Sequence, residues 1–255
     1  IQPLSGFELA ERISFFLWSR LPDDALAALA KAGKLADNEI LEQQVRRMLK
    51  DDRASALADN FAAQWLQLRR LETITPDPGY YPAFDEDLRR DSRRETELFF
   101  SALASDDLSV LTLLDADFSF INERLARHYG VEGIYGSRFR KTEFPDTSQR
   151  GGLLAHGALL TVTSYPGRTS PVLRGKWLLD NLLGTPSPPP PPNVPVLPEA
   201  ERGEIPTSIR ERLDRHREDP VCASCHVIID PLGFALENFD VIGAWREFDE
   251  IGNPV

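Results

Sequence analysis

Apolar residues recur at the three- and four-residue spacing of an α-helix through most of the first 130 residues, and this pattern constrains the fold more than any other feature. Ser5 and Glu8 form a capping-box pattern ahead of the first such run. Asp23 and Asp24 precede a second run, and Asp37 precedes a third. Strand signals are scarce and no internal repeat occurs. The sequence therefore predicts a mainly α-helical protein.

Further helices are predicted along the rest of the chain. Residues 84–103 carry a long amphipathic pattern, and "FSFINERLARHYG" (118–130) predicts one short helix that stops at Gly130. Ser170 and Pro171 open a helix over 170–184, and a last clear helix is expected over 205–218. The pattern loosens between 130 and 150. We predict two packed helical units, residues 1–130 and residues 131–255, the first of unknown function.

Composition and charge limit the classes of partner. The chain has 255 residues, 42% apolar and 27% charged, which is ordinary for a globular protein. Its net charge of −11 disfavours nucleic acid or an anionic membrane as the main partner, because both would repel it. No apolar run approaches the roughly 20 residues that a transmembrane helix needs. The chain begins at Ile1 without an initiator Met, so we expect a processed or excised piece, with further domains in the whole protein.

A proline-rich segment, "TPSPPPPPNVPVLP" (185–198), interrupts the second unit. Its proline density favours polyproline II, an extended conformation without internal hydrogen bonds. It could be a ligand for a proline-recognising domain, but we favour a strap that lies across the surface of its own protein.

Both cysteines of the chain fall in "VCASCHVIID" (221–230), where Cys222, Cys225 and His226 match the C-x-x-C-H pattern of covalent haem c attachment. One helical turn between the two sulfurs lets each form a thioether with one porphyrin vinyl group. The adjacent His226 is then expected to bind the iron. The sequence thus predicts one covalent haem c, with a cytochrome c-like second unit.

Three other chemistries use the same residue types. A thioredoxin-like redox pair normally lies at a helix start within a βαβ pattern, which is not visible here. A zinc site would need Cys222, Cys225, His226 and His216, three of them crowded into five residues. A disulfide closing so short a loop would constrain the unfolded chain little. A thiol- or zinc-binding structural module without haem therefore stays as an alternative.

The second axial ligand is not evident. No Met, His, Cys, Lys or Tyr occurs between 227 and 255, so a protein ligand must come from upstream or from another chain. His216 is the first candidate, because the intervening residues can easily span a haem edge. His156, His128 and Met48 are further candidates, each with a packing or capping role as the competing interpretation. Two strong ligands would suit electron transfer, whereas an open position would suit a haem enzyme of peroxidase or oxidase type.

Residues around the motif suggest the rest of the haem site. Ile228, Leu232 and Phe234 are expected to form an apolar wall over one haem face and exclude water. Arg174, early in its helix, is expected to meet a haem propionate, because a guanidinium matches a carboxylate in shape and charge. "DPLG" (230–233) predicts a turn that ends the attachment helix.

Taken together, several stretches resemble the large planctomycete-type cytochrome c-associated proteins, which are built from domains of unknown function. The resemblance covers almost the whole chain and is carried by "GFELAERISFFLWSRLPDD" (6–24), "QWLQLRRLETITPDP" (64–78), "FSFINERLARHYG" (118–130), "RGGLLAHGALLTVTS" (150–164), "RTSPVLRGKWLLDNLLG" (168–184) and "HREDPVCASCHVIIDPLGFALENFDVIGAWR" (216–246). It implies a periplasmic or otherwise exported protein with a redox role and leaves open whether that role is enzymatic. A redox partner protein with a basic docking patch, and further domains or subunits of a larger assembly, are the expected partners.

Overall fold

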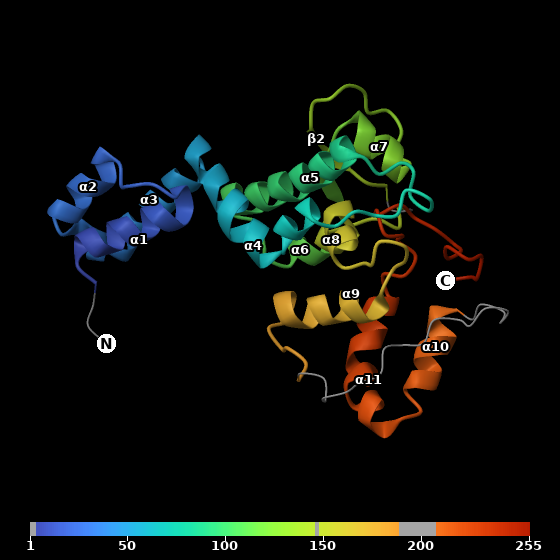
Figure 1. Ribbon diagram of the computed structural model, residues 1–255. Helices are drawn as coiled ribbons and strands as arrows, with labels where there is room; N and C mark the ends of the chain where they lie inside the picture. Colours follow the sequence, from blue (N-terminus) through green and yellow to red (C-terminus); the bar gives the residue numbers. More distant parts are fainter. Residues whose placement is uncertain (1–3, 146–147, 189–207) are drawn as a thin grey trace.

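The computed structural model describes residues 4–145, 148–188 and 208–255, and within these ranges the protein is mainly helical, with eleven α-helices and one small two-stranded sheet (Figure 1). The predicted mainly α fold is confirmed. The α-helices are α1 (Gly6–Trp18), α2 (Asp24–Lys31), α3 (Asn38–Leu49), α4 (Ala63–Trp65), α5 (Glu86–Ser105), α6 (Thr112–Asp115), α7 (Glu123–Tyr129), α8 (Gly157–Val162), α9 (Pro171–Trp177), α10 (Ile209–His216) and α11 (Pro220–Phe234).

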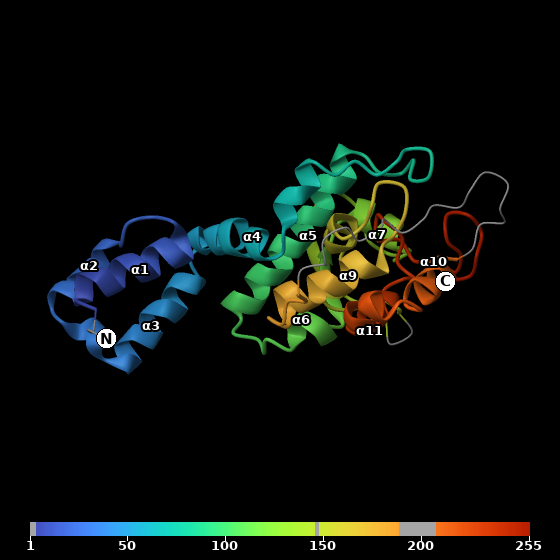
Figure 2. The same cartoon turned by 60° about the horizontal axis from the view of Figure 1, so that its bottom comes forward.

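Helices α1, α2 and α3 form an arm that projects from the rest of the molecule, as both Figure 1 and Figure 2 show. Local sequence sets their starts as predicted. Ser5 and Glu8 make a complete capping box on α1, and the side chains of Asp23 and Asp37 accept hydrogen bonds from the first turns of α2 and α3. The arm has its own core, made by Ala10, Leu17, Trp18, Leu26, Ala30, Leu35, Met48 and Leu57.

The long helix α5 lies at the centre of the body (Figure 2), next to a short antiparallel sheet. Strands β1 (Phe118–Ile121) and β2 (Arg140–Glu143) pair with Phe118 opposite Glu143. The prediction of one helix over 118–130 was therefore wrong in its first half. The helix α7 begins only at Glu123, because the Asn122 side chain accepts from Leu125 N and caps it there, and it ends as predicted at Gly130 in the left-handed conformation.

One large core joins segments from both predicted units. Leu66 and Phe99 from the first pack in the same buried cluster as Leu159 and Trp177 from the second. The full set of buried residues is Ala62, Ala63, Leu66, Leu68, Leu71, Phe99, Leu103, Leu113, Ala116, Phe118, Leu153, Ala158, Leu159, Val162, Trp177 and Leu178. Residues 1–130 and 131–255 therefore share a hydrophobic core.

Helices α9 and α11 cross at very short range, and this crossing holds α11 against α9. A Cβ added at Gly175 would lie 2.0 Å from the Ile229 carbonyl oxygen, and one added at Gly233 would lie 1.8 Å from the Pro171 carbonyl oxygen. Both positions therefore require glycine. Ser170 caps α9 and Pro171 occupies its first turn, as predicted.

The predicted turn at residues 230–233 is not present, because α11 runs on through Pro231 to Phe234. The carbonyl that loses its helical partner at Pro231 is that of Val227, which is an exposed residue. Packing of Gly233 against α9 keeps the segment helical. The predicted helix over 205–218 is observed as α10, and Pro220 opens α11.

Most of the predicted polyproline strap, from residue 189 onwards, lies outside the described residues. Among the helices that the structure does describe, we find none with the length and apolar character required to span a lipid bilayer.

Candidate functional site

Helix α11 presents the C-x-x-C-H residues in its first two turns. Asp219 caps the helix by accepting a hydrogen bond from Val221 N at 2.8 Å, and Pro220 takes the first helical position. Cys222 and Cys225 follow as free thiols, both half-buried. The three-residue spacing places their side chains on the same side of the helix, one turn apart.

His226 is held by a buried carboxylate. Its Nδ1 lies 2.8 Å from Oδ1 of Asp230, one turn further along α11, and Asp230 is 0% exposed. Burial raises the pKa of Asp230, while the His226 hydrogen bond acts against that shift. With Asp230 ionised, Nδ1 carries the proton, which leaves the lone pair of Nε2 free to bind a metal.

Of the four candidates for the second axial ligand, the structure brings only His216 to His226. Their ring centroids are 4.9 Å apart, edge to face, where α10 meets α11. His156 is buried in the core, Met48 is buried in the arm, and Nε2 of His128 donates to the Ile242 carbonyl oxygen at 2.8 Å. The two imidazoles are in direct contact, so α10 would have to shift to admit an iron between them.

The donor set fits haem c better than zinc. Within the described ranges, no three His, Cys, Asp or Glu side chains converge in a way that could hold a metal ion. Attachment of haem c requires fewer protein groups than a zinc site, namely two free thiols one turn apart and one imidazole with an available nitrogen. Cys222, Cys225 and His226 supply these groups.

Arg174 occupies a different environment from the predicted one. It is 1% exposed, and its guanidinium donates to the carbonyl oxygens of Leu236, Phe239 and Asp240 at 2.5, 2.7 and 2.9 Å. Burial lowers its pKa to about 10. These donors bind backbone that follows α11, and the contact with a haem propionate stays a prediction. Arg174 anchors the C-terminal segment to α9.

The predicted apolar wall is divided among three environments. Ile228 is 57% exposed, Leu232 packs against the main core, and Phe234 lies under the Arg210 guanidinium at 4.1 Å from the ring centroid. Sequence reasoning missed two other exposed apolar residues beside the motif, Val221 and Val227. Val221 and Ile228 flank Cys225 on α11, whereas the 100° turn per residue puts Val227 on the other side of the helix from the two cysteines.

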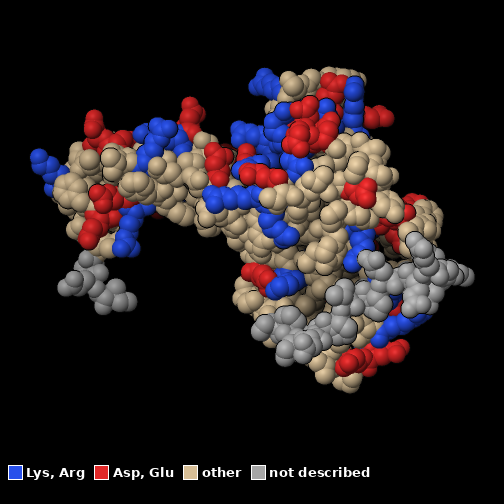
Figure 3. Space-filling model, viewed as in Figure 1, with Lys and Arg blue, Asp and Glu red and all other residues tan. Residues whose placement is uncertain are grey.

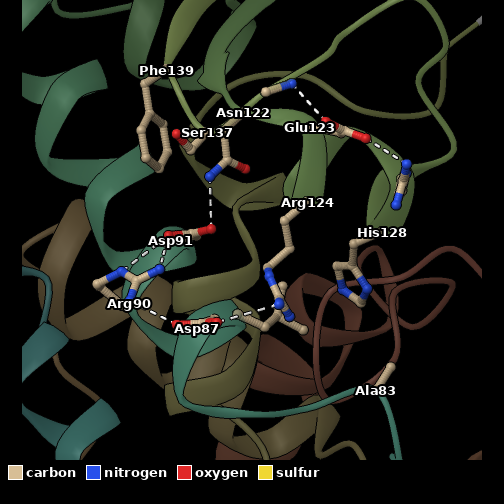
Figure 4. Close-up of a pocket in the computed structure, with 13 residues that line it drawn as sticks. Ala83, Asp87, Arg90, Asp91, Asn122, Glu123, Arg124, His128, Ser137 and Phe139 are labelled. Atoms are coloured by element: carbon tan, nitrogen blue, oxygen red, sulfur yellow. Dashed lines mark hydrogen bonds and ion pairs between the residues drawn. The ribbon is translucent and has the colours of Figure 1, made fainter.

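A pocket of about 920 Å³ lies elsewhere, between α5, α7 and the loop that follows α7 (Figure 4). Its charged side chains pair with one another. Arg90 binds both Asp87 and Asp91, Asn122 donates to Asp91 at 2.7 Å, and Arg127 binds Glu123. Because these charges are mutually satisfied, the pocket presents no unpaired charged group to a ligand.

A cluster of Ser119, His156 and Glu95 has the residue types of a hydrolase triad, but not its arrangement. Ser119 Oγ donates to Glu95 at 2.7 Å and lies 3.3 Å from His156 Nε2, so the serine stands between the acid and the base. All three residues are at most 2% exposed. Burial, together with the charge of Arg150, lowers the pKa of His156 to about 3. The cluster is a buried structural network.

Glu95 should make stability depend on pH. Burial raises the pKa of Glu95 to about 7, although the hydrogen bonds from Tyr129 and Ser119 act to lower it. The folded protein therefore keeps this proton longer than the unfolded chain, and the free energy of unfolding falls by about 3 kcal/mol as pH rises from about 4 to about 7. We expect Glu95→Gln to remove this fall, measured by urea unfolding at several pH values.

Glu86→Gln is the matched control for that experiment, because Glu86 lies on the same helix with an 84% exposed side chain. Its pH dependence should stay close to that of the unmodified protein. Parallel stability curves for Glu95→Gln and the unmodified protein would contradict the role given to Glu95.

Comparison with protein-family models finds two matches. Residues 4–131, half of the chain, match a family described as protein of unknown function (DUF1592), and residues 150–249 match a second described as protein of unknown function (DUF1588). These two are the cytochrome c-associated domains of unknown function from planctomycetes. No curated protein and no solved structure matches the chain. The chain thus belongs to the DUF1592 family, and the region that follows is similar to the DUF1588 family.

Proposed function

We propose that this chain is an exported c-type cytochrome domain that transfers electrons through one haem c, bound covalently at Cys222 and Cys225. The observation that carries the proposal is the pair of free thiols, Cys222 and Cys225, one turn apart on α11. The imidazole of His226 follows them, and its Nδ1 is hydrogen-bonded to the buried carboxylate of Asp230. The cytochrome c association of both matched families supports it. When bound, haem c supplies reversible one-electron transfer.

Each residue of the motif has a separate task. Cys222 and Cys225 would hold a porphyrin through thioethers, and His226 would bind its iron through Nε2. The exposed side chains of Val221 and Ile228, which flank Cys225 on α11, would shield that edge of the cofactor from water. A low-dielectric surrounding disfavours the extra positive charge of ferric iron, so this shielding would favour the reduced state.

The proposal is tested by producing the chain in the periplasm of a host with a haem c maturation system. A Soret band that stays with the polypeptide through acid–acetone extraction is the expected result. Protein that matures without covalent haem, while a control cytochrome c in the same host acquires it, would refute the proposal.

His216 is proposed as the second axial ligand, because it is the candidate whose ring contacts His226. The reduced, matured protein should then bind carbon monoxide slowly, whereas His216→Ala should bind it at once, since the ligand position is open. Absorption spectra after mixing with carbon monoxide provide the measurement. Arg215→Ala, the preceding residue of α10, is the matched control and should behave like the unmodified protein.

Prompt carbon monoxide binding by the unmodified protein would exclude His216 as a tight ligand. It would favour the alternative function, a haem enzyme of peroxidase or oxidase type with an open iron position.

The net charge of −11 favours a redox partner with a basic docking patch. The face seen in Figure 3 carries Lys and Arg interspersed with Asp and Glu above α5 and α7, so the acidic excess does not form one uniform patch there. We propose the periplasm or another exported compartment as the location, and further domains or subunits of a larger assembly as additional partners.

A further inference from the structure

The environment of Asp230 is costly for folding. Its side chain is 0% exposed, and Oδ2 has no hydrogen-bond partner. The guanidinium of Arg217 lies beside it without a hydrogen bond, with Nε 3.8 Å from that oxygen. A buried carboxylate with one unsatisfied oxygen destabilises a fold unless it has another task. The other oxygen, Oδ1, lies at hydrogen-bond distance, 2.8 Å, from Nδ1 of His226.

This contact determines which nitrogen of His226 is available. A carboxylate only accepts hydrogen bonds, so the shared proton belongs to Nδ1 and the lone pair of Nε2 is exposed to a ligand. The negative charge also draws Nδ1–H towards Asp230, which makes the imidazole a stronger electron donor than one bonded to a neutral acceptor.

We propose that Asp230 is a positioning residue for the iron ligand His226, and that its charge lowers the reduction potential of the bound haem. This inference rests on the proposed haem attachment. A more strongly donating imidazole stabilises ferric over ferrous iron, so more driving force is needed to add the electron. The effect opposes that of the apolar residues beside the motif.

The positioning role can be tested without haem. In haem-free full-length protein labelled with ¹⁵N at histidine, the side-chain nitrogen shifts should show His226 with its proton on Nδ1. In Asp230→Ala the Nε2-protonated form should become the major neutral form, because the acceptor is gone. An Nε2 proton on His226 in the unmodified protein would overturn the positioning role.

The role of the charge is tested in matured protein by redox titration. Asp230→Asn retains an oxygen acceptor of the same size but removes the charge, and its reduction potential should rise. Asp219→Asn is the matched control, because it removes one charge at the cap of the same helix and asparagine caps equally well. Its potential should change less.

The two experiments, the nitrogen shifts and the redox titration, distinguish failure of the proposed function from failure of the role given to Asp230. If no covalent haem forms in any variant, the proposed function fails, and the nitrogen shifts still decide whether Asp230 sets the His226 tautomer. If haem attaches but the potentials of Asp230→Asn and Asp219→Asn shift equally, haem attachment stands and the charge role of Asp230 is rejected.

Discussion

Replacing Cys222 and Cys225 together by alanine is expected to abolish covalent haem. Both thioethers would be lost, and the two cysteines are the only ones in the chain, so no other thiol can substitute. The fold should persist, because both side chains are only half-buried and alanine favours a helix. Haem staining after denaturing electrophoresis, together with intact mass, measures the loss.

Ser224→Ala is the matched control, because Ser224 lies between the two cysteines on α11 and is exposed. It should mature with full covalent haem. Cys225→Ala alone should retain at most one thioether. Covalent haem at unmodified levels in the double variant would refute attachment at this motif, and with it the proposed electron transfer.

Gly233→Ala is expected to lower the free energy of unfolding by about 3 kcal/mol, because the new methyl group would overlap the Pro171 carbonyl group and force α9 and α11 apart. A backbone carbonyl cannot turn away as a flexible side chain can. Urea unfolding followed by circular dichroism measures the loss. The matured protein should also retain less haem, since α11 carries the proposed attachment residues.

Gly167→Ala provides the control for that substitution. A Cβ at Gly167 would meet only the Tyr80 ring, at 3.8 Å, which is ordinary van der Waals contact. Its stability should stay within about 0.5 kcal/mol of the unmodified protein. Equal stability of Gly233→Ala and Gly167→Ala would show that α9 and α11 do not pack as closely as the structure indicates.

Features that depend on a few adjacent residues could be predicted from sequence. The capping box of Ser5 and Glu8, the stop at Gly130 and the helix start at Ser170 were all confirmed. Each involves hydrogen bonds or backbone angles within about four residues, so the local sequence contains the physical cause.

Predictions that required distant partners were less successful. Residues 118–121 form a strand because 140–143 pair with them, and α11 continues through Pro231 because α9 packs on Gly233. The predicted turn at 230–233 also kept the contact between Asp230 and His226 from being predicted. His226 and Asp230 have the four-residue spacing of helix neighbours, but a turn at 230–233 would have separated them.

The sequence alone determined the helical class, the caps and the position of the C-x-x-C-H residues, because periodicity, side-chain capping and thiol spacing are local properties. Only the tertiary structure decided the environment of each remaining side chain. It buried Arg174 among carbonyl groups, brought His216 against His226, and placed the Asp230 carboxylate on the imidazole. Burial and contact between segments far apart in the chain arise from packing, which no local pattern contains.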